Sequence, residues 1–173
     1  MIALLYYLFI LFQIGFILYL FYFSLSFIKG APYVPSKKRT AEIMINFAHI
    51  KPGMMVYDLG SGDGRLLFLA AKRGATAIGY EINPILVIYS EIIKLFSGCR
   101  HNIKFIWKDF WKANLENADI VFIYLLPWKM DRLKTILLYQ LKPGALVISN
   151  SFIFPKWKIY QQDTLNHIYV FRV

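Results

Sequence analysis

Cysteine and acidic residues are both scarce in this chain. Of its 173 residues, one is cysteine and 10 are acidic, against 20 basic residues, so the formal net charge is +10. A lone Cys99 cannot form an internal disulfide, which excludes a disulfide-stabilised secreted domain and agrees with a reducing compartment. The apolar content of 58% excludes a disordered or collagen-like chain. The three histidines lack the spacing of metal ligands, so we expect no metal site.

Charge is also absent from residues 1–28, of which 24 are apolar. As a helix this stretch would measure about 40 Å, more than the roughly 30 Å hydrocarbon core of a bilayer. It is too long for the apolar run of a signal peptide and lacks the charged start. We therefore expect a transmembrane anchor over 1–28, with residues 2–28 in the lipid bilayer; the alternative is a helix buried in an oligomer. A multi-span protein is excluded because no second uncharged apolar stretch is long enough.

Basic residues follow the apolar segment closely, at Lys29, Lys37, Lys38 and Arg39. By the positive-inside rule, the protein is a single-pass membrane protein whose residues 29–173 lie on the cytoplasmic side. The net positive charge is consistent with a neighbouring anionic membrane surface. Compositional drift explains it equally well, and we do not expect nucleic acid as a partner, because that reading needs a clustered basic patch.

The remaining chain divides into a connector over 29–36 and a folded domain over 37–173. Helical patterns alternate with short apolar runs that are typical of buried strands. This alternation predicts an α/β, Rossmann-like fold with a mostly parallel sheet and a closing antiparallel hairpin. Helices are expected at 37–50, 64–73, 84–97 and 129–141, and strands at 54–59, 76–81, 103–107, 120–126, 145–152, 157–161 and 166–172.

A glycine-rich turn, DLGSGDGR, follows the first predicted strand at 58–65. Open α/β sheets bind ligands at this edge. The glycine spacing is G-x-G-x-G, and Arg65 stands where a dinucleotide fingerprint needs its third glycine. A phosphate-binding Gly-Lys-Ser/Thr sequence is missing as well. Such a turn lets a ligand approach the backbone and directs amides toward an anionic group such as a carboxylate.

Acidic residues also stand at the ends of the next two strands. Glu81 ends the second strand, where a carboxylate can accept both hydroxyl hydrogens of a ribose. Asp109 follows the third strand and could receive an adenine amino group, with Phe110 or Trp107 beside the ring. Together with Asp58, these residues predict a nucleoside site; the alternative is a set of solvated strand-end carboxylates.

Several motifs resemble class I S-adenosylmethionine-dependent methyltransferases, and the resemblance extends over 32–158. More narrowly, they are similar to a subfamily of small membrane-anchored prokaryotic methyltransferases and mitochondrial protein-lysine N-methyltransferases. The motifs are APYVP (31–35), DLGSGDGR (58–65), GYEINP (79–84), KDFW (108–111), YLLP (124–127), SNSF (149–152) and PKW (155–157).

This resemblance implies the class I methyltransferase sheet and S-adenosylmethionine as cofactor. It implies that Asp58, Gly60, Gly62 and Gly64 hold the methionine moiety, Glu81 the ribose and Asp109 the adenine end. Their neighbours Ser61, Asp63, Asn83 and Phe110 complete the expected cofactor-binding set. Asn150 stands where members of the subfamily often have histidine.

The resemblance further implies methyl transfer to a lysine amine of a membrane-associated protein. The alternatives are methylation of a lipid or isoprenoid and a non-catalytic cofactor-binding module. No general base stands out, because a lysine amine can lose its proton through burial or beside the sulfonium. Substrate-side candidates are Tyr33, Tyr124, Pro127 and Trp128, since aromatic faces suit a methylated cation; ordinary packing is the alternative. The connector either covers the site or is a passive linker.

Overall fold

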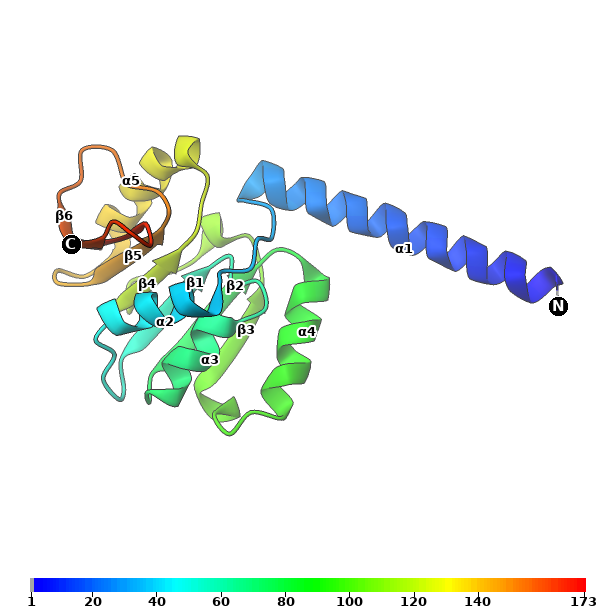
Figure 1. The fold of residues 1–173 in the computed structure, drawn as a ribbon, viewed down its shortest axis with the longest axis horizontal. Helices are drawn as coiled ribbons and strands as arrows, with labels where there is room; N and C mark the ends of the chain where they lie inside the picture. Colours follow the sequence, from blue (N-terminus) through cyan, green and yellow to red (C-terminus); the bar gives the residue numbers. More distant parts are fainter. Residues whose placement is uncertain (1) are drawn as a thin grey trace.

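A seven-stranded sheet forms the centre of the computed structural model, which describes residues 2–173 (Figure 1). The strands lie in the order β3-β2-β1-β4-β5-β7-β6. The five strands from β3 to β5 are parallel, and β7 pairs antiparallel with both β5 and β6. The predicted α/β sheet with a closing hairpin is therefore confirmed. The strands are β1 (Met55–Leu59), β2 (Thr76–Glu81), β3 (Ile103–Trp107), β4 (Ile120–Ile123), β5 (Leu146–Asn150), β6 (Ile159–Asp163) and β7 (Ile168–Arg172).

Helices cover both faces of this sheet because successive residues of its strands point to opposite sides. Val56 and Phe122 pack with α2 (Lys38–Phe47), α3 (Arg65–Lys72) and part of α4 (Pro84–Leu95). Tyr57 and Val121 pack on the other face with α5 (Met130–Gln140). Every strand end near β1 is therefore held between two apolar layers, which fixes the edge where ligands bind in such sheets.

Three boundaries differ from the sequence prediction. The strand expected to continue to Leu126 ends at Ile123, because its partners Leu59 and Ser149 are the last that β1 and β5 offer it. Just beyond Leu59, Gly60 turns the chain away with φ of 92°. Short 3-10 segments that the sequence did not indicate occupy 100–102, 110–112 and 127–129.

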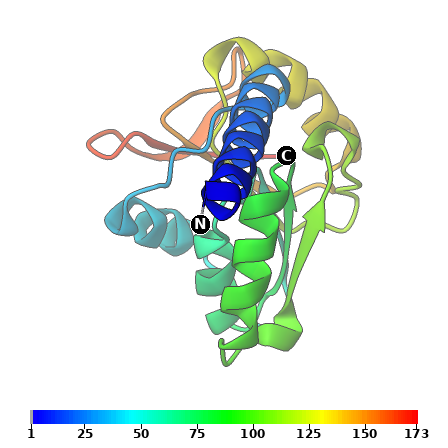
Figure 2. The ribbon, with the colours of Figure 1, turned by 90° about the vertical axis from the view of Figure 1, so that its right-hand side faces the viewer.

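The N-terminal helix α1 (Ile2–Lys29) projects away from the domain (Figures 1 and 2). Within residues 2–173 it is the one helix long and apolar enough to cross a membrane. Its most apolar window is entirely unburied, so it does not serve as a core helix of this chain. Apolar side chains all around a helix are typical of a helix in lipid or in a protein interior.

The C-terminal end of α1 is held against the domain by hydrogen bonds. Lys129 Nζ donates to the carbonyl oxygens of Phe27, Ile28 and Gly30 at 2.9, 2.7 and 2.8 Å. The Trp111 indole donates to the Lys29 carbonyl. These groups satisfy carbonyls that have no partner within the helix, and the lysine charge suits the negative end of the helix dipole. The direction in which α1 leaves the domain is thereby set.

Gly64, at the start of α3, gives a test of the packing under the glycine turn. It has φ of 77°, and a Cβ atom there would lie 2.5 Å from Phe105 Cζ. Gly53 has a similar φ of 85°, yet a Cβ atom there would meet nothing within 4 Å. We expect Gly64→Ala to lower the free energy of unfolding by about 3 kcal/mol, from left-handed strain and overpacking together. Gly53→Ala should lower it by about 1 kcal/mol, and urea titration of both proteins in detergent compares them. Equal losses would contradict the packing.

Candidate functional site

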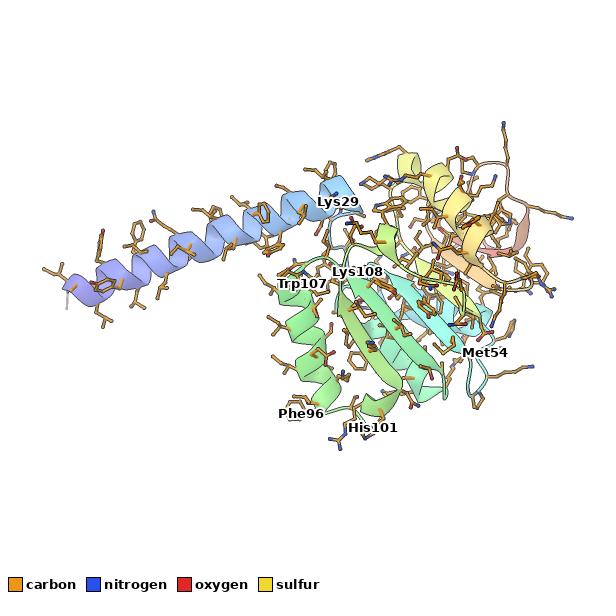
Figure 3. All side chains as sticks on the ribbon, turned by 180° about the vertical axis from the view of Figure 1, so that it is seen from behind. Lys29, Met54, Phe96, His101, Trp107 and Lys108 are labelled. Atoms are coloured by element: carbon orange, nitrogen blue, oxygen red, sulfur yellow. The ribbon has the colours of Figure 1, made fainter. Side chains whose placement is uncertain are left out.

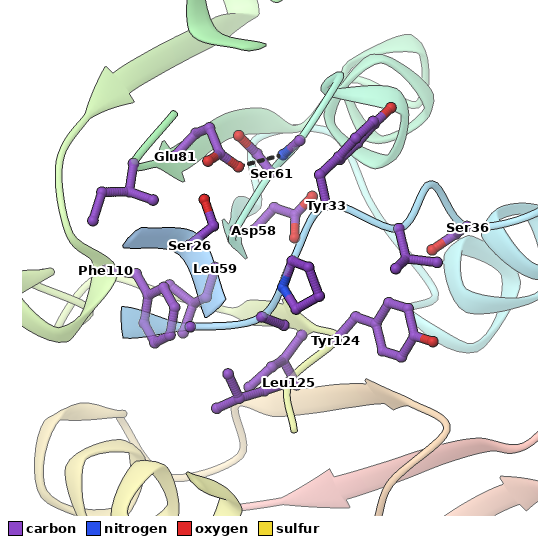
Figure 4. A pocket seen from close by; sticks show the side chains of 18 of the residues that line it. Ser26, Tyr33, Ser36, Asp58, Leu59, Ser61, Glu81, Phe110, Tyr124 and Leu125 are labelled. Atoms are coloured by element: carbon purple, nitrogen blue, oxygen red, sulfur yellow. Dashed lines mark hydrogen bonds between the residues drawn. The ribbon is translucent and has the colours of Figure 1, made fainter. Parts of the chain in front are cut away.

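A pocket of about 90 Å³ lies at the carboxyl ends of β1, β2 and β4 (Figure 4). The end of α1, the connector, the glycine turn and the residues after β4 all contribute to its wall. Ten of the residues that the sequence singled out line it: Tyr33, Asp58, Gly60, Ser61, Gly62, Asp63, Glu81, Asp109, Phe110 and Tyr124. Residues from six separate segments therefore meet at the predicted edge of the sheet.

The glycine turn is fixed to the end of β2. Backbone N–H groups of Gly60 and Ser61 both donate to the Tyr80 carbonyl oxygen, at 2.9 and 3.0 Å. The third contact is the Gly62 N–H, which donates to Glu81 Oε2 at 2.9 Å. Gly62 has φ of 54°, and a Cβ atom there would lie 2.7 Å from the Tyr33 ring. A side chain at this position is therefore excluded both by the backbone and by the ring above it.

Glu81 joins the turn to the start of α4. Its Oε1 accepts a hydrogen bond from the Asn83 N–H at 2.8 Å, while Oε2 accepts from Gly62 (Figure 4). Burial raises the pKa of Glu81, and the backbone hydrogen bonds from Asn83, Gly62 and Ile82 oppose that rise. Each carboxylate oxygen has two lone pairs, so the carboxylate retains the capacity to accept further hydrogen bonds from a ligand.

Asp58 has a buried carboxyl group without a cationic partner. Burial is the main cause that raises its pKa to about 8, and the neighbouring charges of Glu81 and Asp63 raise it further. None of residues 2–173 donates a side-chain or backbone hydrogen bond that would lower it. The Ser61 hydroxyl oxygen, in the same wall, is buried and has no hydrogen-bond partner. Buried polar atoms of this kind carry a free-energy cost that a polar ligand would remove.

The connector crosses the mouth of the pocket and is held by Arg65. The Arg65 guanidinium binds both oxygens of Asp63 and donates to the Ser36 carbonyl. These hydrogen bonds outweigh burial and lower the pKa of Asp63. Burial and then the Asp63 carboxylate raise the pKa of Tyr33. Asn150 Nδ2 also reaches Ser36 Oγ, at 3.3 Å. The connector therefore lies over the site and forms part of its wall.

Four predicted site residues lie outside the pocket wall. Gly64 packs against the Phe105 ring beneath the turn, and Asn83 caps α4 by accepting from the Ile85 N–H at 3.0 Å. Pro127 and Trp128 lie in a 3-10 turn beside the end of α1, and the Trp128 side chain is exposed. Trp107 is exposed too, so of the two rings considered next to Asp109 it is Phe110 that lines the pocket.

The sequence did not indicate that α1 itself contributes to the pocket. Ser26, Lys29 and Gly30 all line it, and Lys29 Nζ lies 4.0 Å from Asp109 Oδ2. Arg65 was noticed for the glycine it replaces, whereas its contact with the connector was missed. A basic residue directly after an acidic turn, with a short connector upstream, was the available signal for that ion pair.

Comparison with known proteins gives concordant results. The ANTKMT methyltransferase domain family matches residues 58–161. The adenine nucleotide translocase lysine N-methyltransferase of Mus musculus is 37% identical over 128 residues, covering 73% of this chain and 56% of that protein. The protein-lysine N-methyltransferase of Saccharolobus islandicus is 32% identical over 137 residues, covering 77% and 84%. A lysine N-methyltransferase of Rattus norvegicus, named for an ATP synthase, is 39% identical over 126 residues. This chain spans little more than half the length of the animal relatives that it matches.

Solved structures give the same fold. The crystal structure of an RNA methyltransferase from Salinibacter ruber in complex with S-adenosyl-L-homocysteine is 34% identical. It covers 80% of this chain and 92% of its own, with a TM-score of 0.75. A methyltransferase structure from Thiobacillus denitrificans, at 20% identity and a TM-score of 0.60, shares the fold. With its glycine turn and acidic strand ends inside the matched region, this chain belongs to the ANTKMT methyltransferase domain family.

Proposed function

We propose that this protein is an S-adenosylmethionine-dependent methyltransferase that transfers a methyl group to a lysine amine of a membrane-associated protein. The observation that carries the proposal is the buried Asp58 carboxyl group beside Glu81 at the glycine turn. The names of the rat and Saccharolobus relatives support lysine as the acceptor. The substrate named for the mouse relative, adenine nucleotide translocase, supports a membrane protein as the target.

The pocket's polar groups suit a nucleoside that carries an amino-acid tail. Asp58 would bind the methionine ammonium group, and the unpartnered Ser61 hydroxyl and the amides of the Gly60–Gly62 turn would meet the methionine carboxylate. Glu81 would accept hydrogen bonds from the ribose hydroxyls. Asp109 and Phe110 would contact the adenine end. Asp63, Gly64 and Asn83 would support the site indirectly, through the connector, the turn and the cap of α4.

Alignment is the main task of the chain, since the sulfonium supplies an activated methyl group. The acceptor nitrogen must reach the methyl group in line with the departing sulfur. A free lysine amine, with a pKa of about 10.4, is protonated at neutral pH. Apolar surroundings lower that pKa. Tyr33 and Tyr124, at the pocket wall, supply aromatic faces for the amine and its methylated product.

We further propose that residues 1–28 anchor the protein in a membrane, with 2–28 in the bilayer, and that 37–173 form the catalytic domain on the cytoplasmic side. Lys29, Lys37, Lys38 and Arg39 support this orientation through the positive-inside rule. Since Ser26 and Lys29 of α1 line the pocket, its mouth would lie next to the bilayer surface. A substrate in the same membrane would meet the site at high effective concentration.

RNA is the second candidate substrate, because the Salinibacter relative carries the name RNA methyltransferase and this chain has a net charge of +10. We favour protein lysine. An apolar helix at the pocket mouth is of no use to a soluble polyanion, whereas it brings the site to membrane proteins.

Asp58 should release a proton when the cofactor binds. Its pKa of about 8 keeps the carboxyl group mostly protonated at pH 7 in the empty protein. A bound ammonium group favours the carboxylate and lowers that pKa, so binding at pH 7 releases close to one proton and affinity rises between pH 6 and pH 8. Calorimetric titration of the full-length protein with S-adenosylhomocysteine, in buffers of different ionisation enthalpy, measures this release. Asp58→Asn should abolish it. Unchanged affinity and proton release in Asp58→Asn would contradict the assignment.

The connector must move to admit the cofactor, because the pocket of about 90 Å³ is smaller than the ~300 Å³ and above that small-molecule sites occupy. Losing the Arg65 hydrogen bonds should increase the open population about tenfold. Chymotryptic cleavage after Tyr33, followed by mass spectrometry, should therefore be about tenfold faster in Arg65→Gln. Arg73→Gln is the matched control, because Arg73 also binds a backbone carbonyl, that of Ile45 at 3.1 Å, but does not contact the connector. Equal cleavage rates in the two variants would show that Arg65 does not hold the connector.

Methyl transfer is tested on membranes from cells that lack the gene. With the full-length protein and S-adenosylmethionine labelled in its methyl group, label should enter a protein band and appear as methyl-lysine after hydrolysis. Glu81→Gln should reduce the rate at limiting cofactor by roughly tenfold, since it weakens a hydrogen bond to a charged group. Glu116→Gln, at an exposed carboxylate, is the control. Label found in RNA or extractable lipid alone would overturn the protein-lysine assignment.

A further inference from the structure

Helix α4 is apolar on two opposite faces. One face packs on β2 and β3 through Val87 and Ser90, and Ser90 Oγ donates to the Gly62 carbonyl at 3.2 Å. The opposite face carries six large apolar side chains, each at least half exposed: Ile85, Ile88, Tyr89, Ile92, Leu95 and Phe96. Their spacing of three, four and seven residues places them along one stripe.

A stripe of this kind is unusual on the outside of a domain. The outward face of a surface helix is normally polar, and Glu91 and Lys94 are the polar residues that lie between these apolar ones. Large contiguous apolar surfaces mark contacts with membranes or other proteins. Another surface therefore covers α4 in the working protein.

The direction of α1 indicates which surface that is. α4 lies on the side of the domain toward which α1 projects, and runs across the direction of α1 (Figures 1 and 2). Seen from behind, Phe96 and Trp107 lie along that same side of the domain (Figure 3). Lys129 and Trp111 hold the end of α1 against the domain, so this arrangement does not depend on a free linker. A bilayer crossed by α1 would therefore face the stripe on α4.

The residues around α4 suit the boundary between lipid headgroups and acyl chains. Trp107 is 61% exposed at the end of β3, and Trp128 is 68% exposed beside the end of α1. Tryptophan is enriched at membrane interfaces. Residues 83–108 contain four basic residues, Lys94, Arg100, Lys104 and Lys108, and one acidic residue. This charge balance is complementary to an anionic membrane surface.

We propose that α4 is a second membrane contact, an in-plane helix whose exposed stripe inserts into the interface of the anionic bilayer that α1 spans. This inference rests on the proposed insertion of α1. Amphipathic helices in the membrane plane bury their apolar face at the headgroup boundary. Because Ser90 of α4 bonds to the glycine turn, this contact orients the pocket at a fixed height above the membrane.

Nitroxide labels in the full-length protein test the proposal. The background is Cys99→Ser, and the vesicles contain phosphatidylcholine and phosphatidylglycerol at a ratio of about 7 to 3, an anionic surface. Single labels are placed at Ile88→Cys and Ile92→Cys on α4 and at Phe16→Cys within α1. Leu165→Cys is the matched control, because Leu165 is 91% exposed in the β6–β7 turn, on the far side of the domain from α1. Collision rates with oxygen and with a water-soluble nickel chelate then report membrane depth.

The proposal expects oxygen to exceed the nickel chelate at positions 88 and 92, and the reverse at 165. If positions 88 and 92 collide with nickel as readily as 165 does, while 16 lies in the acyl region, α4 does not touch lipid although α1 spans the bilayer. If 88 and 92 are shielded from both reagents, a protein surface covers the stripe, and the lipid proposal is also wrong. Nickel access at position 16 would instead contradict the membrane insertion of α1, on which the inference depends.

Discussion

The hydrogen bond from the Gly62 N–H to Glu81 is the contact on which the arrangement of the site depends. It joins the turn after β1 to the end of β2, and the other carboxylate oxygen joins both to the start of α4. The carboxylate would be costly to bury alone, and the two backbone donors reduce that cost. Asp58 is left beside it, buried without a cation. That imbalance is a feature of a binding site rather than of a core, because a core would have paired or removed the charge.

The second constraint is the end of α1. Three carbonyl oxygens there accept hydrogen bonds from one lysine, Lys129, and Ser26 and Lys29 of the same helix line the pocket. An apolar helix joined to the pocket wall places the site beside whatever surrounds that helix. On our proposal this surrounding is a membrane, and the target lysine is brought to the pocket by sharing that membrane. The exposed stripe on α4 and the basic residues around it are consistent with the same arrangement.

Much of this architecture could be predicted from residue patterns. The strands over 76–81 and 103–107 were placed correctly, because apolar runs bounded by glycine and polar residues leave little choice. Asp58 and Glu81 were expected near the glycine turn, since parallel strands end at one edge of a sheet. Strand pairing could not be foreseen where it depends on neighbours, and so the strand after Ile120 was predicted three residues too long. The contribution of α1 to the pocket was missed for a similar reason: the contacts of Lys129 cross about 100 residues of chain.

A structure of the full-length protein with bound S-adenosylhomocysteine tests the central claim most directly. On the proposed assignment, the ligand's ammonium group lies against the Asp58 carboxylate, its ribose hydroxyls bond to Glu81, and the connector at Tyr33–Ser36 is displaced. A ligand bound elsewhere, or a pocket that stays closed with Glu81 turned away from the ligand, would contradict the account.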